Sequence, residues 1–210
     1  MISLLHSSSF FLFGARGVGK STLLSKLFPK SKALWIDLLD SEQEQRLARE
    51  PKQLELEIRA LPKRVKWVVI DEIQKLPSLL NLVHRLIEDR SLDVRFALTG
   101  SSASKLHHGG ANLLAGRAYV FELYPFSHRE LGAEFCLDSA LRWGTLPKAV
   151  AVDSNRSKQN FLETYARTYL KEEVWAEHLI RQLSPFRKFL EIAAQSNSQL
   201  INFSNIARDV

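Results

Sequence analysis

The stretch Phe10–Phe28, FFLFGARGVGKSTLLSKLF, decides the fold of this 210-residue chain. A short apolar run, Phe10–Phe13, is followed by a glycine-rich loop, and the loop passes into an apolar-periodic segment that Pro29 stops. Proline ends helices because it lacks an N–H group and clashes with the preceding turn. The order of residues therefore predicts a strand, then a loop, then a helix over Ser21–Leu27.

The loop, Gly14–Ser21, fits the pattern G-x-x-x-x-G-K-[ST] of phosphate-binding loops. Its glycines let successive backbone N–H groups turn toward one point, and the start of the following helix favours an anion there. We expect Lys20 to reach the β- and γ-phosphates of a nucleoside triphosphate and the Ser21 hydroxyl to bind Mg²⁺. The candidate nucleotide-binding residues are Gly14, Ala15, Arg16, Gly17, Val18, Gly19, Lys20, Ser21 and Thr22.

A second motif, WVVIDE at Trp67–Glu72, resembles a Walker B motif, with four apolar residues followed by two acids. We expect Asp71 to orient Mg²⁺ through a bound water and Glu72 to polarise the water that attacks the γ-phosphate. Kinases of small molecules align a substrate hydroxyl instead and do not need such a glutamate. The alternative interpretation of the motif is a strand that ends in two solvated acids.

A third run, Val94–Leu98, ends in Thr99-Gly100-Ser101-Ser102. In the additional-strand class of P-loop NTPases, this strand lies between the loop strand and the strand that carries the acids. We therefore expect the hydroxyls of Thr99 and Ser101 to sense the γ-phosphate or to hold the water. The alternative is an ordinary group of capping residues at a turn.

Strand-like and helix-like segments alternate through the first part of the chain, which predicts an α/β fold with a parallel sheet between helices. The expected strands are Phe10–Phe13, Ala33–Leu38, Trp67–Ile70, Val94–Leu98 and Tyr119–Leu123. The expected helices of this part are Ser21–Leu27, Pro51–Leu61 and Ser78–Arg90. After Pro125 the strand pattern fades, and helices are expected at Gln159–His178, Pro185–Gln195 and Ser204–Val210.

The composition is typical of a globular protein, with 45% hydrophobic and 25% charged residues. Since no apolar run reaches the roughly 18 residues that span a bilayer, we expect no membrane partner. A single cysteine, Cys136, and the lack of a signal peptide favour a reducing, cytoplasmic location. The net charge of +6 is compatible with a nucleic-acid partner but does not require one.

Several blocks in succession resemble a group of prokaryotic AAA+ ATPases often called AAA family 14, which usually carry a C-terminal domain of unknown function. These blocks are FGARGVGKSTLL, WVVIDEIQKLPSLLNLVHRLIE, FALTGSSASKL, GGANLLAGRA and ELYPFSHREL. Two later signatures, GTLP at Gly144–Pro147 and YARTYLKEEV at Tyr165–Val174, extend the resemblance. The resemblance implies ATP binding and hydrolysis by a three-layer P-loop NTPase core of the additional-strand (ASCE), AAA+ type.

The resemblance also implies a domain organisation, with the nucleotide-binding core over residues 1–130 and a helical lid over 131–180. Residues 181–210 resemble the first two helices of a winged helix-turn-helix, with Ser204 as the N-cap of the second. Such proteins normally continue well past this length, so we expect an incomplete DNA-binding segment in a truncated chain. The alternative is a pair of lid helices unrelated to DNA.

In AAA+ proteins a neighbouring subunit usually supplies an arginine to the γ-phosphate, which implies a homo-oligomer. Arg117, just before the strand Tyr119–Leu123, occupies the corresponding place, and Gly116 would let the backbone present it. Arg95 and Arg129 are further candidates, and a surface ion pair is the alternative role.

The leading hypothesis is a Mg²⁺-dependent ATPase that drives or switches a partner. A nucleotide-controlled DNA-binding switch with little turnover is the second hypothesis, and a P-loop small-molecule phosphotransferase is the third.

Overall fold

The computed structural model describes residues 7–101, 114, 116–169, 182–196, 200 and 202–209. The chain divides into two compact units, Met1–Ala151 and Val152–Val210. Of the boundaries expected from the sequence, residue 130 lies within a short helix of the first unit, and residue 180 lies outside the described residues. The division into core, lid and C-terminal segment stays a prediction.

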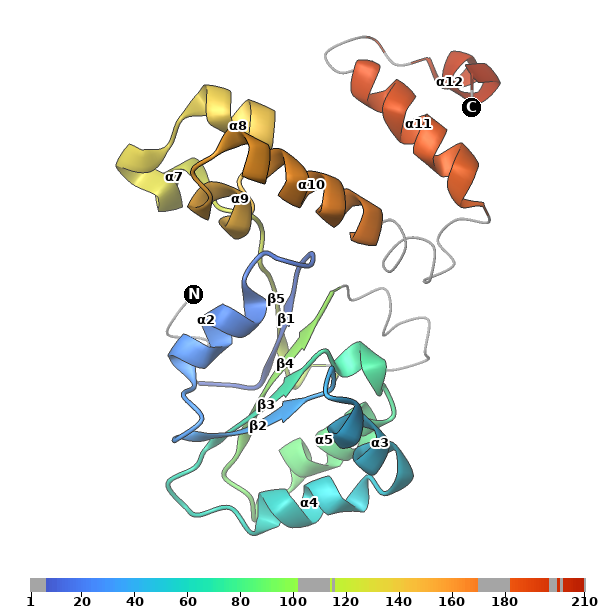
Figure 1. Cartoon of the computed structure of the whole chain (residues 1–210). Helices are drawn as coiled ribbons and strands as arrows, with labels where there is room; N and C mark the ends of the chain where they lie inside the picture. The colour runs from blue at the N-terminus through green and yellow to red at the C-terminus, as the bar shows by residue number, and fades with distance from the viewer. Residues whose placement is uncertain are drawn as a thin grey trace. The chain divides into compact units, whose positions relative to one another are not determined.

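The first unit is built on a five-stranded sheet in the order β2-β3-β4-β1-β5, and every neighbouring pair of strands is parallel (Figure 1). The strands are β1 (Phe10–Phe13), β2 (Ala33–Asp37), β3 (Trp67–Asp71), β4 (Arg95–Gly100) and β5 (Tyr119–Glu122). β4 lies between β1 and β3, as expected for the additional-strand class. The predicted α/β fold with a parallel sheet is confirmed.

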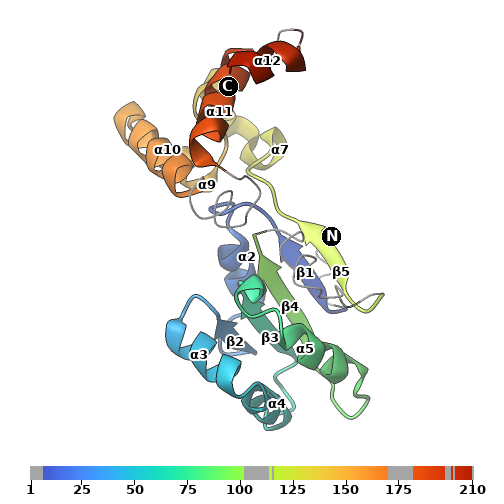
Figure 2. The same ribbon diagram turned by 90° about the vertical axis from the view of Figure 1, so that its right-hand side faces the viewer.

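Helices cover both faces of the sheet, because side chains on successive strand residues point to opposite faces. On one face, Phe10 and Leu12 of β1 pack with Leu24 of α2 (Lys20–Leu27). On the other face, Phe11 and Phe13 belong to a larger cluster with α3, α4 and α5 (Figures 1 and 2). These three helices are α3 (Ser41–Arg49), α4 (Lys52–Arg59) and α5 (Leu79–Glu88). The three-layer core is thus also confirmed.

The structure contains a helix, α3, that the sequence pattern did not predict. Its residues, SEQEQRLAR, offer one buried apolar side chain, Leu47, so there was no stripe to detect. The helix begins at a cap instead, since the Asp40 side chain accepts a hydrogen bond from the Glu42 N–H at 2.9 Å. β4 also differs from the expectation, because it continues to Gly100 and so includes Thr99.

After β5, short helices complete the first unit. They are α7 (His128–Leu131), the 3₁₀ turn η2 (Gly132–Glu134), α8 (Leu137–Trp143) and α9 (Pro147–Ala151). A capping box begins α7, where the Ser127 hydroxyl accepts from the Glu130 N–H and the Glu130 carboxylate accepts from the Ser127 N–H. A helical segment was expected after residue 130, but not these individual helices, because each is too short to show an apolar period.

The second unit contains α10 (Asn155–Tyr169), α11 (Leu183–Gln195) and α12 (Phe203–Asp209). The expected helix Gln159–His178 begins earlier, at Asn155, and its last part lies outside the described residues. The prediction of Ser204 as an N-cap is wrong. The Asn202 side chain accepts from the N–H groups of Ser204 and Asn205, so Asn202 caps α12 and Ser204 lies inside it.

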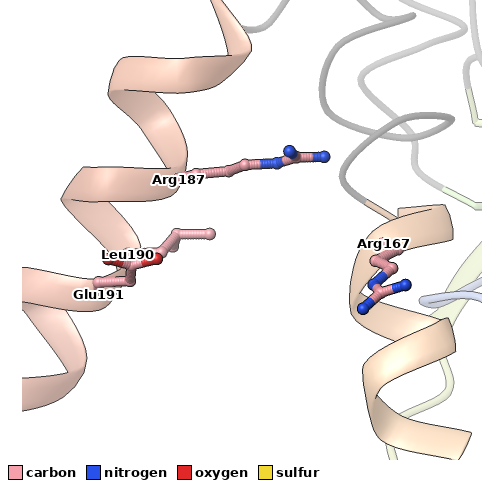
Figure 3. A pocket seen from close by; sticks show the side chains of 4 residues that line it. All are labelled: Arg167, Arg187, Leu190 and Glu191. Carbon is pink, nitrogen blue, oxygen red and sulfur yellow. The ribbon is translucent and has the colours of Figure 1, made fainter.

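Between α10 and α11 there is a hollow lined by Arg167, Arg187, Leu190 and Glu191 (Figure 3). Arg187 extends from α11 into the hollow, and Arg167 lies on α10 opposite (Figure 3). Among the helices that the structure describes, none combines the length and apolar character needed to cross a bilayer.

Candidate functional site

The candidate residues gather at one edge of the sheet, because the carboxyl ends of parallel strands meet there. The loop that begins at Gly14 follows β1, and Glu72 follows β3. Phe13, the last residue of β1, is paired with Gly100, the last residue of β4, so the ends of these two strands are adjacent. The structure thus brings the glycine loop, the two acids and the Thr99–Ser101 segment to the same edge.

The glycine loop has a backbone that only glycine adopts readily. Gly17 and Gly19 have φ angles of 81° and 98°, in the left-handed region. At Gly14, an added Cβ would lie 2.3 Å from the Leu123 carbonyl oxygen, so this position has no room for a side chain. Gly19 is the N-cap of α2, and no described side chain accepts a hydrogen bond from the N–H groups at this helix start. Backbone N–H groups are therefore presented at the start of a helix, where an anion is favoured.

Lys20 is the first residue of α2, and only 6% of its surface is exposed. Its Nζ donates hydrogen bonds to the carbonyl oxygens of Gly14 at 2.7 Å and Ala15 at 3.2 Å. The ammonium group therefore lies over the loop. Ser21 and Thr22, which follow in the first turn, are exposed.

The remaining loop positions divide by exposure. Val18 is buried, and its N–H donates a hydrogen bond of 3.5 Å to the Ala15 carbonyl oxygen. Arg16 is exposed.

The two acids are held by a threonine on the neighbouring strand. Asp71 ends β3 and is buried, and Glu72 follows it in a left-handed conformation with φ 60° and ψ 46°. The hydroxyl of Thr99, which is fully buried, donates to Asp71 Oδ1 and accepts from the Glu72 N–H at 2.9 Å. Thr99 thus joins the two acids, and its predicted contact with a phosphate stays a prediction.

Sequence reasoning missed one polar residue of the site, Gln74, in the 3₁₀ turn η1 (Ile73–Lys75). Its Nε2 donates to Glu72 Oε2. In the part of the chain that the structure describes, two buried oxygens have no hydrogen-bond partner, Gln74 Oε1 and Ser101 Oγ. Unsatisfied buried polar atoms are rare in native structures, so each requires an explanation. In the sequence, the only sign of a role for this residue is that a polar amide stands two residues after Glu72.

Arg117 lies at the opposite edge of the sheet, because it precedes β5 and the glycine loop follows β1. Its guanidinium forms an ion pair with Glu88, the last residue of α5. Arg95 begins β4 at the same amino edge, and its Nε donates to the Ser7 carbonyl oxygen at 3.1 Å. The structure does not bring either arginine to the glycine loop of its own chain.

The residues at the carboxyl edge fit a magnesium nucleotide by their chemistry. The Ser21 hydroxyl and the Asp71 carboxylate offer the hard oxygen ligands that Mg²⁺ prefers. The residues that the structure describes contain no group of three or more histidine, cysteine or acidic side chains that would bind a metal without a nucleotide.

Comparison with protein families gave two matches that together cover most of the chain. The model of the AAA_14 family, described as AAA domain, matches residues 6–132. A domain of unknown function, DUF8612, matches residues 136–210.

Two mycobacterial proteins are similar in sequence, Mb2031c of Mycobacterium bovis and Rv2008c of Mycobacterium tuberculosis, both described as uncharacterized. Each is 25% identical over 143 residues, which cover 68% of this chain and 32% of the relative. The chain therefore spans about a third of the length of these relatives.

Solved structures with a similar arrangement include two Pif1 helicases and the Drosophila ORC bound to DNA. One Pif1 helicase, studied in unwinding of forked double-stranded DNA, has a TM-score of 0.40 at 17% identity, covering 60% of this chain and 42% of its own. Bacteroides Pif1 bound to single-stranded DNA has a TM-score of 0.42 at 15% identity, covering 78% and 47%. ORC has a TM-score of 0.41 at 15% identity, covering 95% and 60%. Similarity at this level says nothing about what this chain binds.

Proposed function

The chain belongs to the AAA_14 family of AAA domains, and from this premise we propose that it binds ATP with Mg²⁺ and hydrolyses the γ-phosphate. Membership of the family supports an ATPase-like, nucleotide-binding function in general terms. The specific proposal rests on the residues at the carboxyl edge of the sheet.

The observation that carries the proposal is the connection that Thr99 makes between Asp71 and Glu72. The strand that supplies Thr99 is paired with β1, so both acids are held on the side of the sheet where the glycine loop begins. A lysine that is almost fully buried, Lys20, lies over that loop. Acids and a cation fixed in this way are what phosphoryl transfer requires, since its catalysis is mostly positioning and charge stabilisation.

In this proposal each residue has a separate task. The N–H groups of the loop and the Lys20 ammonium hold the β- and γ-phosphates. Ser21 and Asp71 would hold Mg²⁺, and the ion would neutralise charge on the phosphate oxygens. Glu72 accepts a proton from the attacking water as the water oxygen bonds to the γ-phosphorus. The bond from that phosphorus to the β–γ bridging oxygen breaks, which yields ADP and phosphate.

A nucleotide-controlled DNA-binding switch is the second candidate. One observation favours it, the pair of arginines at the hollow between α10 and α11, because two guanidinium groups on neighbouring helices suit backbone phosphates (Figure 3). Slow turnover that does not change with protein concentration, together with salt-dependent DNA binding, would favour the switch over the ATPase.

Phosphate release from ATP tests the proposed function, measured with Mg²⁺ and with EDTA over a range of protein concentrations. We expect release only with Mg²⁺. Lys20→Ala should weaken ATP binding at least about tenfold, roughly 1.4 kcal/mol, because no neighbour replaces its charge in that geometry. Lys26→Ala, at an exposed lysine later in α2, is the matched control and should bind like the parent. If calorimetry finds the same ATP affinity for the parent, Lys20→Ala and Lys26→Ala, the glycine loop is not the phosphate-binding loop.

A further inference from the structure

The amide group of Gln74 forms a hydrogen bond through its nitrogen, while its oxygen has no described hydrogen-bond partner. Its Nε2 donates to Glu72 Oε2, while its Oε1 is buried and has no hydrogen-bond partner among the described residues. This oxygen lies 2.8 Å from the position that a Cβ on residue 100 would occupy, so the amide packs against the backbone of Gly100. Gly100 ends β4, the strand that also supplies Thr99.

The orientation of the amide follows from the charge of Glu72. An ionised carboxylate only accepts hydrogen bonds, so the NH₂ group of Gln74 must face it. The reversed amide would place two oxygens against each other. Glu72 therefore fixes the orientation that leaves Gln74 Oε1 buried without a donor, which destabilises the fold. A methionine would fill nearly the same space without an unpaired acceptor. Stability alone does not explain an amide at this position.

Glu72 is held at two points, each by a different residue. Thr99 accepts a hydrogen bond from its backbone N–H, and Gln74 donates to its carboxylate. The backbone of Glu72 is in the left-handed conformation, which is unfavourable for a residue with a side chain and persists where surrounding contacts enforce it. Both contacts therefore fix one acid whose conformation the chain would not adopt by itself.

We propose that Gln74 is a positioning residue that holds the Glu72 carboxylate by one oxygen and leaves the other oxygen to accept the proton of the attacking water. This inference rests on the proposed function of Glu72. Misplacement of a reacting group by about 1 Å can reduce a rate on the order of 100-fold. Gln74 acts through Glu72 and does not itself exchange a proton with the substrate.

The test uses Gln74→Met, which removes both polar atoms and keeps the approximate shape. Gln45→Met, at an exposed glutamine of α3, is the matched control. We expect single-turnover hydrolysis at saturating ATP to fall about tenfold or more, because the base is no longer held. The ATP affinity measured by calorimetry should stay within about twofold, since the phosphate loop is intact. The melting temperature should be unchanged or higher, because the unpaired acceptor is gone.

A double-mutant cycle distinguishes positioning of Glu72 from any other effect. In the Glu72→Gln background, Gln74→Met should not slow hydrolysis further, because the group that it positions is already absent. Gln74→Glu, which keeps the size but replaces the donor with a second acid, should be at least as slow as Gln74→Met.

Different results would refute the role of Gln74 and the proposed function of Glu72. If Glu72→Gln is slow while Gln74→Met hydrolyses like the parent, only the role of Gln74 is refuted. A loss of rate together with lower ATP affinity and a lower melting temperature would show that Gln74 is structural. A parent chain that binds ATP without hydrolysing it, or a Glu72→Gln variant that turns over normally, overturns both proposals.

Discussion

Thr99 carries no charge, yet its hydroxyl joins the two acids of the candidate site. The sequence predicted a hydroxyl at this edge of the sheet, but not its partners. β4 continues through Thr99 to Gly100, and this places the hydroxyl beside Asp71 on the neighbouring strand. Pairing between strands far apart in the sequence decides such contacts, and no local pattern encodes it.

Thr99→Val tests this arrangement at the level of a single residue. Valine keeps the shape but leaves the Glu72 N–H and Asp71 Oδ1 without the hydroxyl. We expect the free energy of unfolding to fall by about 1–3 kcal/mol, the cost of leaving buried polar groups unpaired. Thr99→Ser keeps the hydroxyl and should retain most of the stability. Urea unfolding measures both changes, and a Thr99→Val variant as stable as the parent would contradict the described bonds.

The glycine loop could be predicted residue by residue, because the pattern specifies backbone conformation and charge at fixed spacing. The left-handed φ angles of Gly17 and Gly19 and the close approach of Leu123 to Gly14 are the physical reasons for those glycines. Gln74 could not be predicted in the same way. Its importance arises from contacts with Glu72 and Gly100, and neither contact is visible in the sequence.

At the level of elements, the apolar runs predicted the five strands of the described sheet. β1, β3 and β4 are nearly continuous in apolar residues because they are buried between helices. The apolar pattern did not predict α3 and α7, which begin at side-chain caps. α3 begins at the Asp40 cap, and hydrogen bonds from Gln43 and then from the Glu42 N–H lower the pKa of that carboxyl. α7 begins at the capping box of Ser127 and Glu130. Hydrogen bonds from the Ser127 backbone and hydroxyl lower the pKa of Glu130 below its ordinary value of 4.5.

The capping box predicts a pH dependence of stability. Because folding lowers the pKa of Glu130, its stabilising effect is present above 4.5 and is lost as the pH falls through the lower value in the folded protein. Glu130→Gln keeps the size of the side chain but not its charge. We therefore expect the parent to be more stable than this variant at pH 7, and the difference to shrink below about pH 4.5.

Urea unfolding at pH 7, 4 and 3 measures this difference. Glu134→Gln, at an exposed acid of η2, is the control and should show a smaller dependence on pH. A difference between the parent and Glu130→Gln that stays constant at all three pH values would mean that the capping box does not form.

At the scale of the whole molecule, Arg117 does not lie beside the glycine loop of its own chain. Arg117 pairs with Glu88 at the amino edge of the sheet, while the glycine loop lies at the carboxyl edge. We therefore expect Arg117 to act on a nucleotide that a second copy of the chain binds. The resemblance to AAA+ proteins led to the same expectation, and the assembly itself stays a prediction.

Mixing two inactive variants tests whether Arg117 acts between subunits. Lys20→Ala lacks the loop cation, and Arg117→Ala lacks the arginine, so each alone should hydrolyse little ATP. An arginine supplied by a partner accelerates hydrolysis about 10³- to 10⁵-fold. Mixed assemblies contain some complete sites, and we expect phosphate release to return in part. Lys20→Ala mixed with Arg129→Ala provides the comparison for the other candidate arginine.

Two results would contradict a role of Arg117 in a neighbouring site. Arg117→Ala alone could hydrolyse ATP like the parent, or the mixture could stay inactive although light scattering shows that both variants assemble together. Either outcome would leave Arg117 with a structural role such as its ion pair with Glu88. An ion pair at the protein surface contributes about 0–1 kcal/mol.

The central claim is that Glu72 is the base of an ATP-hydrolysing site, and the most direct measurement compares phosphate release by the parent, Glu72→Gln and the control Glu134→Gln with ATP and Mg²⁺. Glutamine keeps the shape of Glu72 and removes the charge that accepts the proton. The account predicts that Glu72→Gln binds ATP like the parent and hydrolyses it roughly 10²-fold or more slowly, the usual contribution of a general base. Phosphate release by Glu72→Gln at the rate of the parent and of Glu134→Gln would contradict it.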